Sequence, residues 1–345
     1  MIESLERDVD NLQPVNNTAT YFYGKATARA ARLALRAEEF DQESLVHIVQ
    51  EFLEKSITPW LDGTFQGNIL VFDGKWGGII SRDGANDSTG DFGLGVYNDH
   101  HYHFGYFCYA SAVLAKLNGD WGCRFKPQIY TLVNDFLTVF QGRRALYTWL
   151  RSFDLWMLHS WASGLTEFPN GRNQESTSEA LNAYYSVALL GLAYGDEHLI
   201  STASTLAALG MRSAKALWHV PSSSTLYEAE FVKENRVMGI LWANKRDSEL
   251  WFATAECREC RLGIQLLPLL PITELLFSDL DYAKELVDWA SEGGGGGGGS
   301  QIRILNVLKR GKLKIRIQIL NVWGEMKIRI LNVWGKCKWK AIYKR

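Results

Sequence analysis

Apolar residues recur at helical spacing through most of residues 1–290. Between residues 42 and 57, for example, Leu45, Val49 and Phe52 fall on one stripe, as on the buried face of an amphipathic helix. A proline at position 59 is expected to end this helix. Comparable patterns predict further helices over residues 21–39, 102–117, 127–140, 176–194, 197–218 and 272–289.

The order of these elements indicates a fold class. Successive helices joined by short or glycine-rich turns favour antiparallel helix pairs. Strands do not alternate with the helices, so an all-α toroid of hairpins fits better than an α/β sheet. The exception is the glycine-rich segment 67–95, in which two short runs, 69–72 and 78–81, have β character. Because so long a loop in a compact domain usually serves function, we expect it to lie near a site.

The character of the chain changes after residue 291. Residues 293–299 are all glycine, and variants of the motif ILNV then repeat from Ile302, Ile317 and Ile328 without a fixed period. The sequence predicts three segments: a folded body (1–290), a glycine-rich linker (291–300) and a basic, repetitive tail (301–345). We favour the interpretation that the tail is irregular, poorly ordered and the product of a gene-model or splicing error. An appended β-hairpin and a basic arm for nucleic acid or membranes are the alternatives.

Charge and composition limit the classes of partner. The net charge of -1 conceals a tail with 13 Lys and Arg against one acidic residue, and a body with 24 basic and 37 acidic residues. Such an acidic body would repel phosphate, which argues against nucleic acid. No apolar run reaches membrane length, and the first residues lack the apolar stretch of a signal peptide. As written, the chain is expected to be soluble and cytoplasmic, with its five cysteines reduced.

The segment YNDHHYHFGYF (97–107) concentrates ionisable groups. Asp99, His100, His101 and His103 occupy five positions at a loop-to-helix junction, where their desolvation without a purpose would be costly. In one interpretation, Asp99 is a general acid in a pocket shaped by histidines and tyrosines. In the other, Asp99 and His103 bind a metal. The metal interpretation is weaker because no His or Glu spacing supplies further ligands, so we predict no metal.

A second segment, NQESTSEALNAYY (173–185), holds two carboxylates four residues apart, Glu175 and Glu179. One interpretation is a capping box, in which Glu179 reaches back to the backbone of Ser176. The other is an acid–base site. A carboxylate pair with a separate aspartic acid is what glycosidic hydrolysis requires, since one group protonates the leaving oxygen and another deprotonates water. The preceding stretch, dense in Trp, His and Asn, favours the second interpretation.

Together with other long motifs, these segments resemble glycoside hydrolase family 81, the endo-1,3-β-glucanases, and its plant-like members most closely. The resemblance extends over residues 1–290. The motifs that carry it are YFYGKATARAARLAL (21–35), PWLDGTFQGN (59–68), DGKWGGI (73–79), YNDHHYHFGYF (97–107), LHSWASGLTEFPNGRNQESTSEALNAYY (158–185), ENRVMGILWANKRDSELWF (234–252) and CRLGIQLLPLLPITELLF (260–277).

The resemblance implies an (α/α)6 toroid as a catalytic domain, whole or with its last helices missing, that hydrolyses internal β-1,3-glucosidic linkages of laminarin- or callose-type glucans. It implies inversion at the anomeric carbon without a metal or other cofactor. It places the general acid at Asp99 and the base at Glu175 or Glu179. We expect Glu179 to be the base and Glu175 to hold water or substrate.

The same resemblance suggests contacts to the sugar chain. The expected substrate-binding residues are Tyr97, His101, Tyr102, His103, His159, Trp161 and Asn173. The family also suggests an extracellular or cell-wall location, which differs from the expectation drawn from the first residues. Two other functions stay open: a catalytically inactive, glucan-binding remnant, and an interaction protein whose acidic body pairs with basic tails. The oligomeric state is left open.

Overall fold

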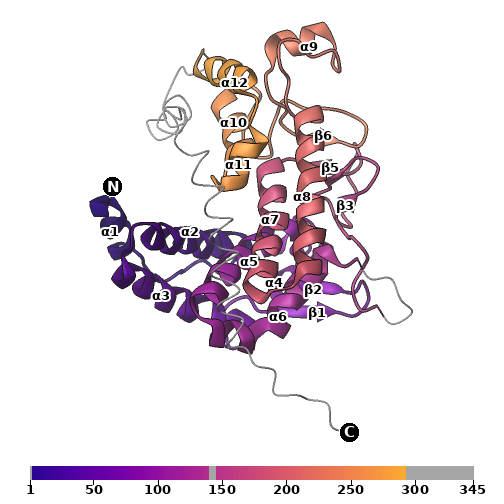
Figure 1. The fold of residues 1–345 in the computed structure, drawn as a ribbon. Coiled ribbons are helices and arrows are strands. Elements are labelled where there is room, and N and C mark those ends of the chain that lie inside the picture. Colours follow the sequence, from indigo (N-terminus) through magenta and orange to yellow (C-terminus); the bar gives the residue numbers. More distant parts are fainter. Residues whose placement is uncertain (1, 140–144, 293–345) are drawn as a thin grey trace.

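The computed structural model describes residues 2–139 and 145–292, and helices dominate it (Figure 1). The helices are α1 (Ile2–Asp10), α2 (Thr20–Glu39), α3 (Glu43–Asp62), α4 (Arg82–Asn86), η1 (Gly90–Val96), α5 (His100–Leu117), α6 (Gly119–Leu137), α7 (Thr177–Tyr194), α8 (Glu197–Leu217), α9 (Ala229–Glu234), α10 (Arg258–Leu266), α11 (Pro271–Leu276) and α12 (Leu280–Glu292). The strands are β1 (Leu70–Asp73), β2 (Gly78–Ser81), β3 (Phe153–Asp154), β4 (His159–Ser160), β5 (Asn173–Gln174) and β6 (Leu241–Trp242).

Three antiparallel helix hairpins, α2–α3, α5–α6 and α7–α8, lie side by side, as the pattern predicted (Figure 1). Helices α2, α5 and α7 form the inner row, and α5 and α7 are buried on nearly every face. The first turns of this inner row meet. The Tyr21 hydroxyl of α2 donates to Glu179 of α7 at 2.7 Å, and the Thr20 hydroxyl bonds His103 of α5. The positive ends of three helix dipoles therefore converge, which favours negative charge there.

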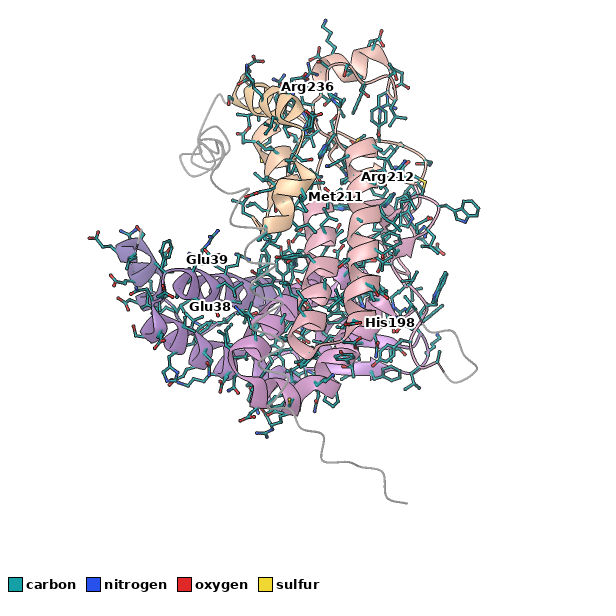
Figure 2. The ribbon with its side chains drawn as sticks, viewed as in Figure 1. Glu38, Glu39, His198, Met211, Arg212 and Arg236 are labelled. Carbon is teal, nitrogen blue, oxygen red and sulfur yellow. A yellow bond between two sulfur atoms is a disulfide. The ribbon has the colours of Figure 1, made fainter. Side chains whose placement is uncertain are left out.

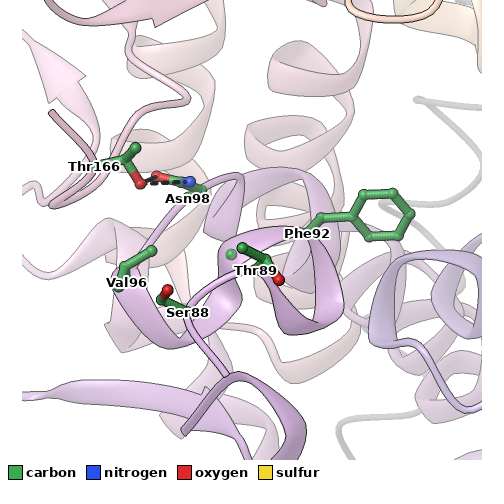
Figure 3. A pocket seen from close by; sticks show the side chains of 7 residues that line it. Ser88, Thr89, Phe92, Val96, Asn98 and Thr166 are labelled. Atoms are coloured by element: carbon green, nitrogen blue, oxygen red, sulfur yellow. Dashed lines mark hydrogen bonds between the residues drawn. The ribbon is translucent and has the colours of Figure 1, made fainter. Parts of the chain in front are cut away.

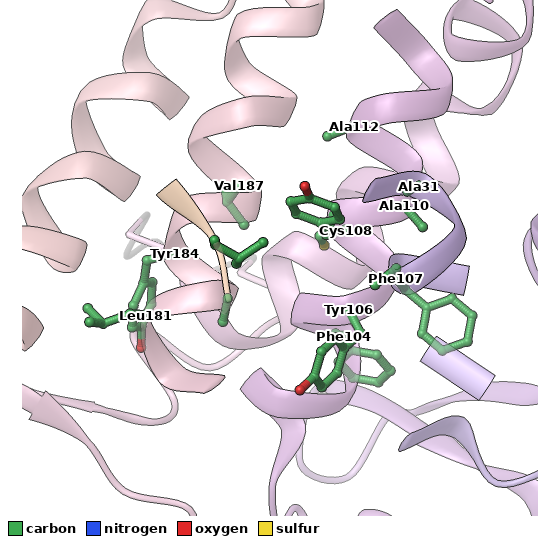
Figure 4. Close-up of a cluster of buried hydrophobic side chains, with 14 of the residues drawn as sticks. Ala31, Phe104, Tyr106, Phe107, Cys108, Ala110, Ala112, Leu181, Tyr184 and Val187 are labelled. Carbon is green, nitrogen blue, oxygen red and sulfur yellow. The ribbon is translucent and has the colours of Figure 1, made fainter. Parts of the chain in front are cut away.

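The core fills the space between the inner helices (Figure 4). Aromatic side chains of α5, including Phe104 and Phe107, are fully buried, as is Tyr184 of α7. The two helices approach most closely at Gly105, where an added Cβ would lie 2.8 Å from the Ala183 Cα atom. Close packing of this kind fixes the two helix starts relative to each other.

The strands form three small antiparallel pairs. Strands β1 and β2 coincide with the two runs of predicted β character in the glycine-rich segment and pair as a hairpin, with Leu70 opposite Ser81. Strand β5 pairs with β6, so that Asn173 lies opposite Trp242. This second pairing brings a loop far along the sequence against the segment that leads into α7.

The segment 235–251, which contains β6, is fastened to α12 through its first residues. Arg236, labelled in Figure 2, lies 3.6 Å from the Glu285 carboxylate, and the Tyr282 hydroxyl donates to the Arg236 carbonyl at 2.7 Å. Within the segment, Lys245 and Asp247 form an ion pair at 2.9 Å. These contacts hold residues 235–251 in place beside the inner helices.

Several predicted boundaries were wrong. Pro59 lies inside α3, which continues to Asp62 and ends at Gly63 with a φ of 76°. The last turn buries Trp60 and Leu61, and this packing offsets the hydrogen bond that a proline removes. Helix α6 begins at Gly119, eight residues before the expected start and upstream of Pro127. The region 272–289 is two helices, α11 and α12, rather than one.

Two further expectations need comment. Cys257 and Cys260, expected to be reduced, are joined by a disulfide with 5.2 Å between their Cα atoms. The expectation was wrong because residues three apart at a helix start can come within disulfide reach.

The predicted linker and tail from residue 293 onward lie outside the described residues. No helix in the described part of the chain is long and apolar enough to cross a membrane.

The close contact at Gly105 predicts a change in stability opposite in sign to the change expected from helix propensity. Replacing a helical glycine by alanine normally stabilises a helix by about 0.5–1 kcal/mol. Gly105→Ala should instead destabilise the protein by about 1–3 kcal/mol, because the new methyl group pushes α5 from α7. Gly263→Ala on α10 is the matched control, since its Cβ meets nothing within 4 Å. Urea unfolding of both variants measures the difference; a stabilised Gly105→Ala variant would contradict the packing.

Candidate active site

Asp99 stands immediately before α5 in a left-handed conformation with a φ of 58°. Its N–H donates to the Ala162 carbonyl at 2.8 Å, and its own carbonyl accepts from the backbone of Tyr102 and His103. Ala162 in turn donates to the Asn173 carbonyl at 2.7 Å. Backbone contacts on both sides thus hold a conformation that non-glycine residues rarely adopt, and Asn173 contributes to that support.

Glu179 lies in the first turn of α7, and its side chain is buried. Its Oε1 atom accepts from the Tyr21 hydroxyl at 2.7 Å and from the Tyr106 hydroxyl at 2.6 Å. The Lys25 ammonium is 3.9 Å from the same oxygen. Two hydroxyl donors and an ammonium group therefore surround one oxygen of the Glu179 carboxylate.

The capping-box interpretation is only half correct. The Ser176 hydroxyl does accept from the Glu179 N–H, at 3.2 Å, and so caps α7. The reciprocal bond is absent among the described residues, because the Ser176 N–H donates to the Tyr102 hydroxyl at 3.1 Å. The carboxylate of Glu179 is therefore free of capping and turned toward the tyrosines.

Glu175 lies outside the helix that carries Glu179, since α7 begins only at Thr177. Its Oε1 atom accepts from the Trp251 N–H at 2.9 Å, and its carbonyl accepts from the Gln265 side chain at 2.6 Å. Gln265 also accepts from the Thr177 hydroxyl at 2.7 Å. Burial, and then the charge of Glu179, raise the pKa of Glu175 to about 7 against the opposing effect of the Trp251 bond.

The three carboxyl groups share one electrostatic environment. Burial raises the pKa of Asp99 well above its ordinary value, and the negative charges of Glu179 and Glu175 raise it further. Like charges in a poorly solvated region cannot all ionise, so a proton is retained. Burial and the two neighbouring carboxyl groups thus favour the protonated form of Asp99.

His101, His103 and His159 are buried, and burial lowers the pKa of each. Burial lowers the pKa of His101 to about 3, and neither of its ring nitrogens has a partner among the described residues. The His103 Nδ1 atom bonds the Thr20 hydroxyl, and burial holds the His103 pKa well below its usual range. The pKa of His159 is also lowered by burial, and its Nδ1 donates to the Ser160 carbonyl at 2.8 Å.

Two predicted site residues have polar atoms engaged away from the carboxyl groups. The Tyr97 hydroxyl donates to Asp73 at 2.9 Å and so braces the β1–β2 hairpin. The Trp161 ring N–H donates to Asp154 at 3.0 Å. Both side chains are buried. Tyr102, in contrast, lies beside the carboxyl groups, because its hydroxyl accepts from the Ser176 N–H at the start of α7.

The sequence analysis did not identify Tyr21, Lys25, Tyr106 and Trp251, which contact Glu175 or Glu179. Tyr21 and Lys25 are four apart on α2, and Tyr106 follows the predicted site residue Tyr102 by four positions on α5, so each pair lies on one helix face. The four-residue spacing in each pair could have indicated that these side chains face the same site. No comparable spacing in the sequence indicates the contact between Trp251 and Glu175.

The loop that precedes Asp99 encloses a hollow of about 350 Å³, lined by Ser88, Thr89, Phe92, Gly93, Val96, Asn98 and Thr166 (Figure 3). The Asn98 side chain donates to the Thr166 hydroxyl at 2.9 Å across its edge. In the same loop, Asp91 and Phe92 have φ values of 51° and 60°. The Thr20 N–H and hydroxyl hold the Asp91 carboxylate at 2.9 and 2.8 Å.

No group of three potential metal ligands occurs in the described part of the chain.

Helix hairpins whose inner members converge on three coupled carboxyl groups define a helical-toroid protein with an acid–base site. The glycosyl hydrolase family 81 C-terminal domain matches residues 1–293. The chain belongs to glycoside hydrolase family 81. A solved family 81 structure from Clostridium thermocellum is similar, with a TM-score of 0.75 and 24% identity over 86% of this chain and 41% of that chain, which confirms the predicted fold class.

Curated relatives agree with this assignment. A glucan endo-1,3-beta-D-glucosidase of Glycine max is 57% identical over 84% of this chain and 44% of its own length. The primary septum glucan endo-1,3-beta-D-glucosidase of Schizosaccharomyces pombe is 30% identical over 76% of this chain and 26% of its own length. The chain thus spans less than half the length of these relatives.

The raised pKa of Glu175 predicts a pH dependence of stability. The folded protein keeps a proton on Glu175 that the unfolded chain loses near its ordinary pKa, about 4.3. Stability therefore falls as pH rises from about 4.3 to 7. Glu175→Gln retains an acceptor for Trp251 but cannot ionise, so it should lose less stability over this interval, by about 1 kcal/mol or more. Unfolding titrations at pH 4.5 and 7 measure this; parallel losses in both proteins would contradict the assignment.

Proposed function

We propose that residues 1–290 are a catalytic domain that hydrolyses internal β-1,3-glucosidic linkages with inversion, with Asp99 as general acid and Glu179 as general base. The observation that carries the proposal is the opposite environment of these two groups. Burial and two negative neighbours keep the proton on Asp99, whereas two tyrosine hydroxyls and Lys25 surround one oxygen of the Glu179 carboxylate. Paired carboxyl groups whose environments differ in this way are typical of acid–base catalysis.

The steps follow from these protonation states. Asp99 donates its proton to the glycosidic oxygen as the bond to the anomeric carbon breaks. A water molecule, deprotonated by Glu179, attacks that carbon from the opposite face, so the configuration inverts. Inversion needs about 6.5–9.5 Å between acid and base to accommodate the water. In this mechanism Glu175, which accepts from the Trp251 N–H, orients water or substrate.

A neutral polysaccharide suits this site. Three carboxyl groups repel an anionic polymer such as nucleic acid, whereas sugar hydroxyls can donate to carboxylates and bond the histidines. His101, His103 and Tyr102 are the predicted sugar contacts that lie around Asp99. The relatives from Glycine max and Schizosaccharomyces pombe, both named as glucan endo-1,3-beta-D-glucosidases, support β-1,3-glucan as the substrate.

A second candidate function is that of a catalytically inactive protein that binds glucan. Binding of laminarin without release of oligosaccharides, in a folded chain, would select this alternative.

Replacing the acid or the base tests the mechanism. Asp99→Asn and Glu179→Gln should each lower kcat on laminarin by about 10²–10⁴-fold, the contribution usual for acid–base groups, whereas Glu175→Gln should cost less. Reducing-end assays measure the rates, and proton NMR of the first product should show the α-anomer. Full activity of Asp99→Asn would remove it from the mechanism, and an initial β-anomer would exclude inversion.

The tyrosine contacts predict a weaker base when they are lost. Tyr106→Phe removes one donor to Glu179, so kcat should fall by about 10–100-fold, in line with about 1.5–3 kcal/mol for a hydrogen bond to a charged group. The acid limb of the pH–rate profile should move to higher pH. Tyr194→Phe is the control, because its hydroxyl bonds only the Gly122 carbonyl at the far end of α7. Equal effects of both changes would contradict a specific role for Tyr106.

A further inference from the structure

Three aromatic rings form a cluster beside Glu175 that the mechanism does not use. Trp242 and Trp251 have ring centroids 5.6 Å apart, and Phe168 lies 5.7 Å from Trp242 and 5.6 Å from Trp251. Each ring contacts the other two, so their orientations are fixed mutually. We refer to Trp242, Trp251 and Phe168 as the Trp251 platform.

The platform presents an apolar surface to solvent. The Trp251 side chain is 57% exposed, and the adjacent Phe252 is 64% exposed. Exposed aromatic area of this size is unfavourable in water and commonly marks a binding surface. The neighbouring rings brace Trp251, so a ligand would meet a surface already in place, with little ordering cost.

The platform is joined directly to the carboxyl groups. The Trp251 backbone N–H donates to the Glu175 Oε1 atom at 2.9 Å. Trp242 pairs with Asn173 in the β5–β6 ladder, two residues before Glu175. Two separate connections therefore place the rings beside Glu175.

The chemistry of this surface selects one type of occupant. Aromatic rings stack on the C–H faces of pyranose rings, which are apolar, while the sugar hydroxyls stay in contact with water. The adjacent carboxyl groups disfavour an anionic ligand. A neutral glucan chain running out of the site satisfies both conditions.

We propose that the Trp251 platform is a glucan-binding subsite that stacks a sugar residue of the chain next to the linkage that is cleaved. This inference rests on the proposed function and adds a determinant of chain binding to it. Because the bond to Glu175 is made by the backbone N–H of Trp251, the side chain can be removed while the donor to the carboxylate is kept.

The experiment separates binding from turnover. In an Asp99→Asn background, calorimetry measures the binding of laminarihexaose with and without Trp251→Ala. Trp251→Ala should weaken binding about tenfold, the size expected of one aromatic contact, and Phe168→Ala should weaken it in the same direction. The control is Trp76→Ala on the β1–β2 turn, which is 47% exposed and distant from β6 (Figure 1) and should leave binding unchanged.

The outcomes are distinguishable. Unchanged hexaose affinity in Trp251→Ala overturns the subsite, and a loss of thermal stability alone shows that the ring is structural and overturns it equally. If the unsubstituted chain hydrolyses laminarin while Trp251→Ala binds normally, only the subsite fails. If the folded, unsubstituted chain neither binds nor hydrolyses laminarin, the proposed function fails and the subsite fails with it.

Discussion

The repulsion between three carboxyl groups at the meeting point of the inner helices governs the rest of this structure. Asp99, Glu175 and Glu179 cannot all be ionised in a poorly solvated space. The helix starts of α2, α5 and α7 bring positive dipole ends to the same place, which makes the remaining negative charge tolerable. The distribution of protons, and with it the proposed division into acid and base, follows from this arrangement.

The surrounding structure can be understood as support for that arrangement. The left-handed backbone at Asp99 is held through Ala162, and Glu179 is held by tyrosines from two other helices. Glycine at position 105 lets α5 and α7 approach closely enough for their first turns to share a site. The histidines whose pKa is lowered by burial add hydrogen-bonding groups without adding charge that would release the proton from Asp99.

Local sequence patterns predicted the features that depend on interactions between residues close in the sequence. The helix pairs, the strands β1 and β2 and the crowding of ionisable groups around Asp99 and Glu179 were all visible in periodicity and spacing. Pro59 and Pro127 misled, because burial of Trp60 and Trp121 outweighs the loss of a hydrogen bond inside a helix. The Glu175–Trp251 contact joins residues 76 positions apart, and no local pattern encodes such a pairing.

The most direct test of the account is the titration of the Asp99 carboxyl group by carbon-13 NMR, assigned by its absence in Asp99→Asn. We expect an apparent pKa well above the ordinary value of about 3.9, and a fall toward that value in Glu179→Gln, where a negative neighbour is removed. An Asp99 that titrates near 3.9 in both proteins would contradict the shared electrostatic environment and the proton assignment that depends on it.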